Sequence, residues 1–140
     1  MICIDASVFV SAVRETEEYY AASRQFLQRV REQAVDVVCP ALILPECAAA
    51  IARPTNDSAL AEEIVDLVEH FAGLRLVALE LPLTRRAAQI ATAHRLRGAD
   101  AVYVAVAEVF GVPLIAWDNE ILRRAPAIVP TMTPTEWMAK

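Results

Sequence analysis

Short apolar runs alternate with amphipathic stretches along the whole chain. Five of these runs predict buried strands, because they are short and nearly continuous in apolar residues; they are Ile2 to Ile4, Val35 to Cys39, Arg75 to Leu79, Pro113 to Trp117 and Ala127 to Val129. Apolar residues at helical spacing between the runs predict helices, at Ala6 to Val13, Thr16 to Gln33, from about Ile43, Ala59 to Ala72, Leu83 to Arg97, Asp100 to Phe110 and Asn119 to Arg124. The stretch Arg53 to Asp57 predicts a turn, with Ser58 capping the helix that follows.

This alternation of apolar strands and helices predicts an α/β protein with a parallel sheet covered on both faces. With 140 residues and no repeat or linker, residues 1 to 140 are expected to form one domain. In such folds ligands bind beyond the carboxyl ends of the strands, near the point where the strand order reverses. The strand ends are therefore the places where candidate chemistry is expected.

Four acidic residues stand at or near strand ends and helix starts inside otherwise apolar segments. Asp5 follows the first strand, Glu46 lies early in an apolar helix, Asp100 begins another, and Asp118 follows the strand PLIAW. Asp5, Asp100 and Asp118 each fit a helix-capping role when considered singly. Glu46 fits that role less well, because its neighbours are almost all apolar and a buried carboxylate is costly unless it is paired or metal-bound.

Together, four converging carboxylates would repel one another without a cation. Oxygen ligands of this kind favour Mg²⁺ or Mn²⁺, and one or two ions are expected. Zinc is not indicated, because His70 and His94 are isolated and Cys3, Cys39 and Cys47 lack ligand spacing. The three cysteines are expected to be reduced and buried.

Other absences narrow the function. Lys140 is the only lysine, which excludes a P-loop and argues against aspartyl-phosphate chemistry, and the three glycines form neither GxGxxG nor GxSxG. A net charge of −5 argues against loose binding of polyanions by the whole surface. No secretory signal or membrane span is visible, so a cytoplasmic protein is expected.

Four segments resemble the PIN domain family, in particular VapC-type toxins of toxin–antitoxin pairs. They are IDAS at Ile4 to Ser7, LPECAAAI around Glu46, LRGADAVYVAVA around Asp100 and LIAWDNEIL around Asp118. The resemblance implies a three-layer α/β/α sandwich with a central parallel sheet of about five strands. It also implies Mg²⁺- or Mn²⁺-dependent endoribonuclease activity, a homodimer and a bound cognate antitoxin.

By this resemblance Asp5, Glu46, Asp100 and Asp118 occupy the family's acidic positions, where they would bind the metal and act in catalysis. Ser7 occupies a frequent small polar position, and Asn119 follows the last acid as a supporting residue. One departure is Ala116, which stands where many members carry Thr or Ser. The loss of that hydroxyl favours, as an alternative, a catalytically weak PIN-like module that binds proteins.

RNA contacts are expected from arginines, which bind phosphates through two parallel hydrogen bonds. The candidates are Arg14, Arg85, Arg86, Arg95, Arg97, Arg123 and Arg124. Arg14, Arg123 and Arg124 follow the acidic strand ends most closely and are the preferred ones. A structure-specific DNA nuclease is a second alternative, which the small size of the chain disfavours.

Overall fold

The computed structural model describes all residues from 1 to 140. Its centre is a five-stranded sheet in the order β3-β2-β1-β4-β5, in which every pairing is parallel. The strands are β1 (Ile2–Ile4), β2 (Val37–Pro40), β3 (Leu74–Val77), β4 (Leu114–Ile115) and β5 (Thr131–Met132). The chain adds strands first on one side of β1 and then on the other, so the strand order reverses at β1 and β4.

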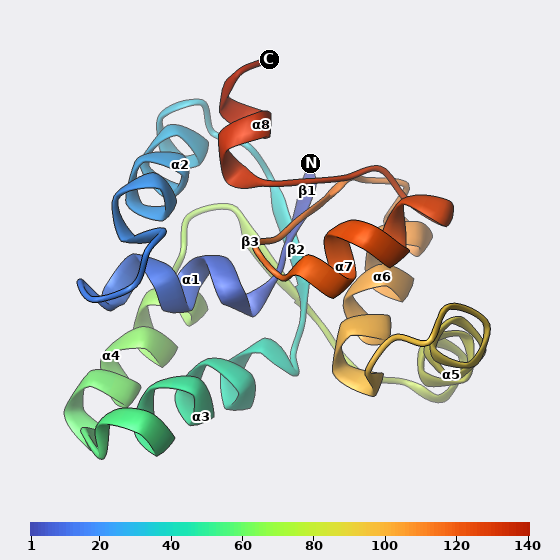
Figure 1. Ribbon diagram of the computed structural model, residues 1–140, viewed down its shortest axis with the longest axis horizontal. Helices are drawn as coiled ribbons and strands as arrows, with labels where there is room; N and C mark the ends of the chain where they lie inside the picture. Colours follow the sequence, from blue (N-terminus) through green and yellow to red (C-terminus); the bar gives the residue numbers. More distant parts are fainter.

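Helices cover both faces of the sheet (Figure 1). One group lies on the left of the view and comprises α1 (Ala6–Val13), α2 (Tyr20–Glu32), α3 (Ile43–Thr55) and α4 (Ser58–Glu69). The other group comprises α5 (Leu81–His94), α6 (Gly98–Phe110) and α7 (Asn119–Arg124). The α/β/α sandwich and its five parallel strands are thereby confirmed.

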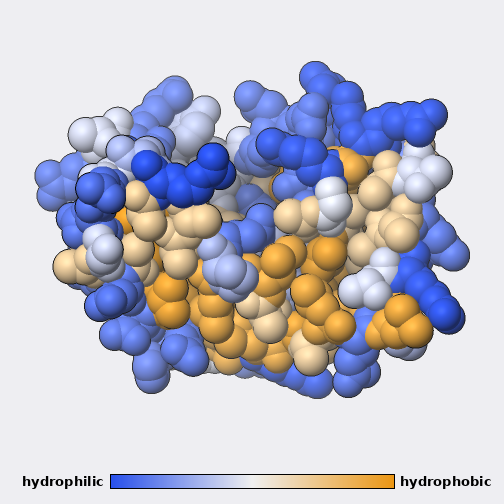
Figure 2. All heavy atoms as spheres, turned by 90° about the horizontal axis from the view of Figure 1, so that it is seen from below, coloured by the Kyte–Doolittle hydropathy of each residue, from blue (hydrophilic) through white to orange (hydrophobic).

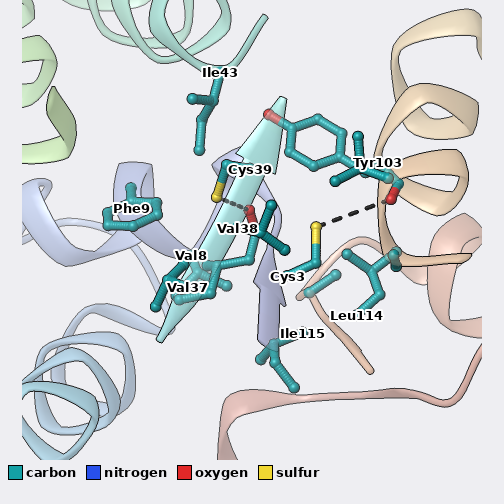
Figure 3. Packing of buried hydrophobic residues seen from close by; sticks show 14 of the residues in the cluster. Cys3, Val8, Phe9, Val37, Val38, Cys39, Ile43, Tyr103, Leu114 and Ile115 are labelled. Carbon is teal, nitrogen blue, oxygen red and sulfur yellow. Dashed lines mark hydrogen bonds between the residues drawn. The ribbon is translucent and has the colours of Figure 1, made fainter. Parts of the chain in front are cut away.

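The core contains 36 buried hydrophobic residues, which lie between the sheet and these helices. Figure 3 shows Val8, Phe9 and Ile43 gathered on one side of β2 and Tyr103 on the other. The cysteines are buried and free, as predicted. The Cys39 thiol donates a hydrogen bond of 3.2 Å to the carbonyl oxygen of Ile4, which helps to join β2 to β1.

Several element boundaries differ from those expected. The second helix begins at Tyr20 rather than Thr16, because the residues before it form turns, one of them closed by the Arg14–Glu17 ion pair of 3.2 Å. The helix before the expected turn continues through Pro54 to Thr55 and ends at Asn56, which adopts a left-handed conformation with φ of 52°. Asp57, not Ser58, caps α4 by accepting a hydrogen bond from the Leu60 N–H.

The last strand was predicted at the wrong place. Residues Ala125–Ala127 form a short 3-10 helix, and β5 follows at Thr131–Met132. A further helix that was not predicted, α8 (Pro134–Met138), packs against α2 with Trp137 edge-on to Phe26 at 5.2 Å between ring centroids. No helix of the protein combines the length and hydrophobicity that crossing a membrane requires.

Candidate active site

The four predicted acids lie together at the carboxyl edge of the sheet. Asp5, Glu46, Asp100 and Asp118 line one pocket of about 320 Å³, and Ser7 lines it with them. The remaining lining residues are Ala6, Val10, Ala50, Arg97 and Ala99. The pocket lies beyond β1 and β4, at the reversal of strand order where ligands of open α/β folds bind.

Asp5 and Asp118 cap helices and also face the pocket. One oxygen of Asp5, Oδ2, accepts a hydrogen bond of 3.1 Å from the Ser7 N–H at the start of α1. Asp118 Oδ1 accepts hydrogen bonds of 2.9 and 3.1 Å from the Glu120 and Ile121 N–H groups at the start of α7. The capping interpretation is therefore correct for both residues, but each cap uses one oxygen and leaves the other for a second partner.

Asp100 and Glu46 are not caps. Both lie in the first turn of their helices, α6 and α3, so their side chains project from helix starts toward the pocket. Glu46 Oε1 and the hydroxyl of Tyr103 are buried, and neither has a hydrogen-bond partner of good geometry. The nearby hydroxyl nevertheless opposes the effect of burial, which raises the pKa of Glu46. Figure 3 shows the Tyr103 hydroxyl beside the carboxyl end of β2. Buried polar atoms without partners are uncommon and point to a missing ligand.

Arg97 is the residue whose importance sequence reasoning missed. It was one of seven arginines considered for RNA contact, but it precedes α6 directly and its guanidinium bridges two of the acids. Its Nε lies 3.0 Å from Asp100 Oδ2 and its Nη2 lies 2.8 Å from Asp118 Oδ2. The signal available in the sequence was its position three residues before Asp100, which is the spacing of a helical ion pair.

Burial dominates the electrostatics of the acids. It raises the pKa of Asp5 to about 7, because the carboxylate is only 5% exposed and the nearby Asp100 and Glu46 charges add to the effect. Burial also raises the pKa of Glu46 and of Asp100, and for Asp100 the hydrogen bond from Arg97 opposes this effect. Burial, rather than a lack of positive charge, is the main cause of the three raised pKa values, since Arg97 also lines this pocket.

The other predicted site residues do not line this pocket. Asn119 is exposed in α7, Arg14 pairs with Glu17, and the Arg124 guanidinium donates to the Arg95 carbonyl oxygen. Arg123 is exposed on α7 and makes no ion pair. Ala116 is completely buried.

The donor set fits a hard divalent cation. It consists of carboxylate oxygens, which are the ligands that Mg²⁺ and Mn²⁺ prefer. One of them, Glu46 Oε1, is buried and has no hydrogen-bond partner. The four acids do not bring three ligand atoms within 4.8 Å of one another; the residues that do are Asp66, Glu69 and His70, which are exposed at the end of α4. That group lies at the opposite edge of the sheet, because α4 leads into the start of β3.

Solved structures with this fold include toxins. VapC20 of Mycobacterium tuberculosis, described as a toxin that cleaves the sarcin-ricin loop, is 16% identical over 88% of this chain and 94% of its own, with a TM-score of 0.74. FitAcB of Neisseria gonorrhoeae is 21% identical over 96% of this chain and 99% of its own, with a TM-score of 0.70. VapBC2 of Rickettsia felis, solved bound to a DNA fragment from its promoter, is 11% identical over 95% of this chain and 98% of its own, with a TM-score of 0.70.

A search of the curated proteins found no match. The family model of the PIN domain, in contrast, matches residues 2–128, which include all four acids and Arg97. The chain thus belongs to the PIN domain family.

Proposed function

We propose that this protein is a metal-dependent endoribonuclease and the toxin of a type II toxin–antitoxin pair. The observation that carries the proposal is the convergence of Asp5, Glu46, Asp100 and Asp118 from four separate segments on one pocket at the switch point of the sheet. Membership of the PIN domain family and the likeness to the fold of VapC20 support it. We further infer that the protein acts in the cytoplasm.

In this proposal the four carboxylates hold one or two Mg²⁺ or Mn²⁺ ions. The bound ion would supply positive charge for the scissile phosphate and a more acidic water for its hydrolysis. Asp5 and Asp118 each have one oxygen fixed by a helix cap, so their orientation does not depend on the ligand. Ser7 supports the same arrangement, because its hydroxyl accepts a hydrogen bond of 3.1 Å from the Trp117 N–H.

The protonation of Asp5 makes ion binding depend on pH. Because its pKa is raised to about 7, this carboxyl carries a proton over much of the acidic range. A cation must displace that proton before both carboxylate oxygens are available. Activity is therefore expected to fall as pH drops below 7.

The test is cleavage of RNA oligonucleotides in Mg²⁺ or Mn²⁺ by the purified protein and two variants. Asp5→Asn and Asp100→Asn keep the size of each side chain and are expected to abolish cleavage while the far-ultraviolet circular dichroism stays native. His70→Ala is the matched control, because it alters the exposed Asp66–Glu69–His70 group and should leave cleavage unchanged. Full metal-dependent cleavage by both acid variants would contradict the proposal.

Two other functions are outcomes of the same experiment. A DNA nuclease would cleave matched single- or double-stranded DNA in preference to RNA. A catalytically weak, protein-binding PIN domain would cleave neither. The second alternative has an observation in its favour, because Arg97 already compensates part of the acidic charge and Ala116 adds no hydroxyl.

The proposed partners are a cognate antitoxin and a second copy of the chain. An apolar surface supports protein partners: Leu79, Leu81 and Val109 are 40%, 59% and 66% exposed beside a cavity of about 460 Å³ between β3, α5 and α6. Figure 2 shows hydrophobic side chains gathered in one band on the face toward which β1 and β2 run. Light scattering of the protein alone and with the product of an adjacent reading frame tests both partners.

A further inference from the structure

A second hollow adjoins the acidic pocket. It encloses about 780 Å³ and is lined by Glu46, Ala49, Ala50, Arg53, Pro54 and Arg97. Glu46, Ala50 and Arg97 also line the acidic pocket, so the two hollows share a boundary. The small side chains of Ala49 and Ala50 leave the surface of α3 open along this hollow, which we call the α3 groove.

Arg97 stands at the boundary between the two hollows. Its side chain is 65% exposed although its guanidinium contacts Asp100, Asp118 and, at 3.9 Å, Glu120. The Asp100 and Asp118 side chains are only 12% and 27% exposed, so water and salt screen these ion pairs only in part. A divalent cation in the pocket would compete for the same carboxylate oxygens, since Asp100 Oδ2 and Asp118 Oδ2 are the atoms that Arg97 contacts.

Arg53 is the second cation of the α3 groove. It lies in the last turn of α3, is exposed, and forms no salt bridge or hydrogen bond through its side chain. With Arg97 turned away from the acids, two guanidinium groups would face one hollow. Paired guanidinium groups bind the phosphates of a nucleic-acid backbone.

We propose that Arg97 exchanges partners during the reaction, an inference that rests on the proposed function. Without a divalent ion it neutralises Asp100 and Asp118. When an ion takes these carboxylates, Arg97 turns into the α3 groove, where it and Arg53 bind phosphates of the RNA strand next to the scissile bond. The α3 groove is thus the RNA-binding surface, and Arg97 connects it to the occupancy of the acidic pocket.

The first experiment measures Mn²⁺ binding by isothermal titration calorimetry. Arg97→Gln should lower the dissociation constant about three- to tenfold, because it removes a competitor whose two pairs are each worth a few-fold in affinity. Arg53→Gln and Arg31→Gln change the net charge equally and should leave the constant within about twofold of the wild-type value. Arg31 lies exposed on α2 and lines neither hollow, so it is the matched control.

The second experiment measures binding of a fluorescein-labelled single-stranded RNA by anisotropy, with and without Mn²⁺, with RNA integrity checked on a gel. In Mn²⁺, Arg97→Gln and Arg53→Gln should each weaken binding about fivefold or more, and Arg31→Gln should not. Without Mn²⁺, only Arg53→Gln should weaken binding, because Arg97 is then held by the acids. Arg97→Lys keeps the charge without the forked geometry and should fall between wild type and Arg97→Gln.

The outcomes separate this inference from the function on which it rests. If the wild type binds Mn²⁺ through Asp5 but Arg97→Gln binds it with unchanged or lower affinity, the partner exchange is wrong and the metal site stands. Equal loss of RNA binding by Arg97→Gln with and without Mn²⁺ would also overturn the exchange. If the wild type binds no Mn²⁺, both this inference and the proposed function fail.

Discussion

The hydroxyl of Ser7 accepts a hydrogen bond of 3.1 Å from the backbone N–H of Trp117. Ser7 follows Asp5 by two residues and Trp117 directly precedes Asp118, so this bond fastens together two acids that are far apart in the sequence. It also joins the start of α1 to the segment after β4. The relationship explains why a small polar residue is needed at position 7 even if it never contacts a ligand.

Replacing Ser7 by Ala should therefore weaken both the fold and the site. The Trp117 N–H would lose its partner in a partly buried place, which should lower the free energy of unfolding by about 1–3 kcal/mol. Urea denaturation measures this loss, and Mn²⁺ titration should show weaker binding. Ser11→Ala on the same helix is the control, because the Ser11 hydroxyl only donates a hydrogen bond of 2.8 Å to the Ser7 carbonyl oxygen. An equal loss of stability in both variants would contradict the role of Ser7.

Asp5 should make the metal-free protein less stable as pH rises. Its folded-state pKa of about 7 lies above the ordinary value of 3.8, so the folded protein binds more protons between these two pH values. The stabilisation is full below pH 3.8 and is lost as pH rises through 7. In EDTA at pH 8, Asp5→Asn should thus be more stable than wild type, by at least about 1 kcal/mol, since each unit of pKa difference corresponds to about 1.4 kcal/mol.

The measurement is urea denaturation of both proteins in EDTA at pH 5 and pH 8. Asp66→Asn, which alters an exposed carboxylate of α4, serves as the control and should follow wild type. If the free energy of unfolding of wild type, relative to that of Asp5→Asn, increases from pH 5 to pH 8, the pKa of Asp5 is not raised.

Tyr103→Phe should separate folding from metal binding. The hydroxyl of Tyr103 is buried without a good hydrogen-bond partner, so removing it should change the free energy of unfolding by less than about 1 kcal/mol. The hydroxyl of Tyr103 lowers the pKa of Glu46 against the larger effect of burial. Its removal should therefore favour the protonated carboxyl and weaken Mn²⁺ binding. Thermal melts with and without Mn²⁺ check this; a large loss of stability in EDTA would mean that the hydroxyl has a structural partner.

The Arg86–Glu108 pair should stabilise the protein slightly, and this stabilisation should be lost as pH falls, whereas that of Asp5 is lost as pH rises. Arg86 donates two hydrogen bonds of 2.8 Å to the Glu108 carboxylate and so joins α5 to α6. This pair lowers the pKa of Glu108, so its stabilisation is present above the ordinary value of 4.5 and is lost as pH falls through the lowered one. Glu108→Gln should lower the free energy of unfolding slightly at pH 7, because the pair is partly exposed, and hardly at all at pH 3.

A double variant, Arg86→Gln with Glu108→Gln, isolates the interaction between the two side chains. If the loss measured by urea denaturation for Glu108→Gln is the same at pH 3 and pH 7, the charge of the carboxylate is not its cause.

The four acids could be predicted because each stands alone in an apolar segment at a strand end or helix start. Parallel strands bring their carboxyl ends to one edge of the sheet, so position in the sequence predicted proximity in space. Arg97 could not be singled out in this way, because the reach of a guanidinium depends on the geometry at the start of α6. Arg14, Arg123 and Arg124 were favoured for nearness in sequence, which does not determine the direction of a side chain.

The end of the chain was harder to predict for a related reason. The two-residue strand β5 carries too few side chains to form a pattern, and pairing with β4 defines it instead. Of the expected strand Ala127 to Val129, Val129 lies in the core and Ile128 packs against it without being a strand, because burial alone does not distinguish a turn of helix from a strand.

The position of β5 has a practical consequence for anyone designing expression clones. The recognisable family segment ends at residue 128, yet the β4 backbone beside Asp118 bonds to residues beyond that limit, through the Leu114 N–H to Pro130 and the Ala116 N–H to Met132. A clone cut at the family boundary would expose both donors and strip the support from one of the four acids. Inactivity of such a shortened product would reflect its missing edge, and assays of this protein should keep the chain through α8.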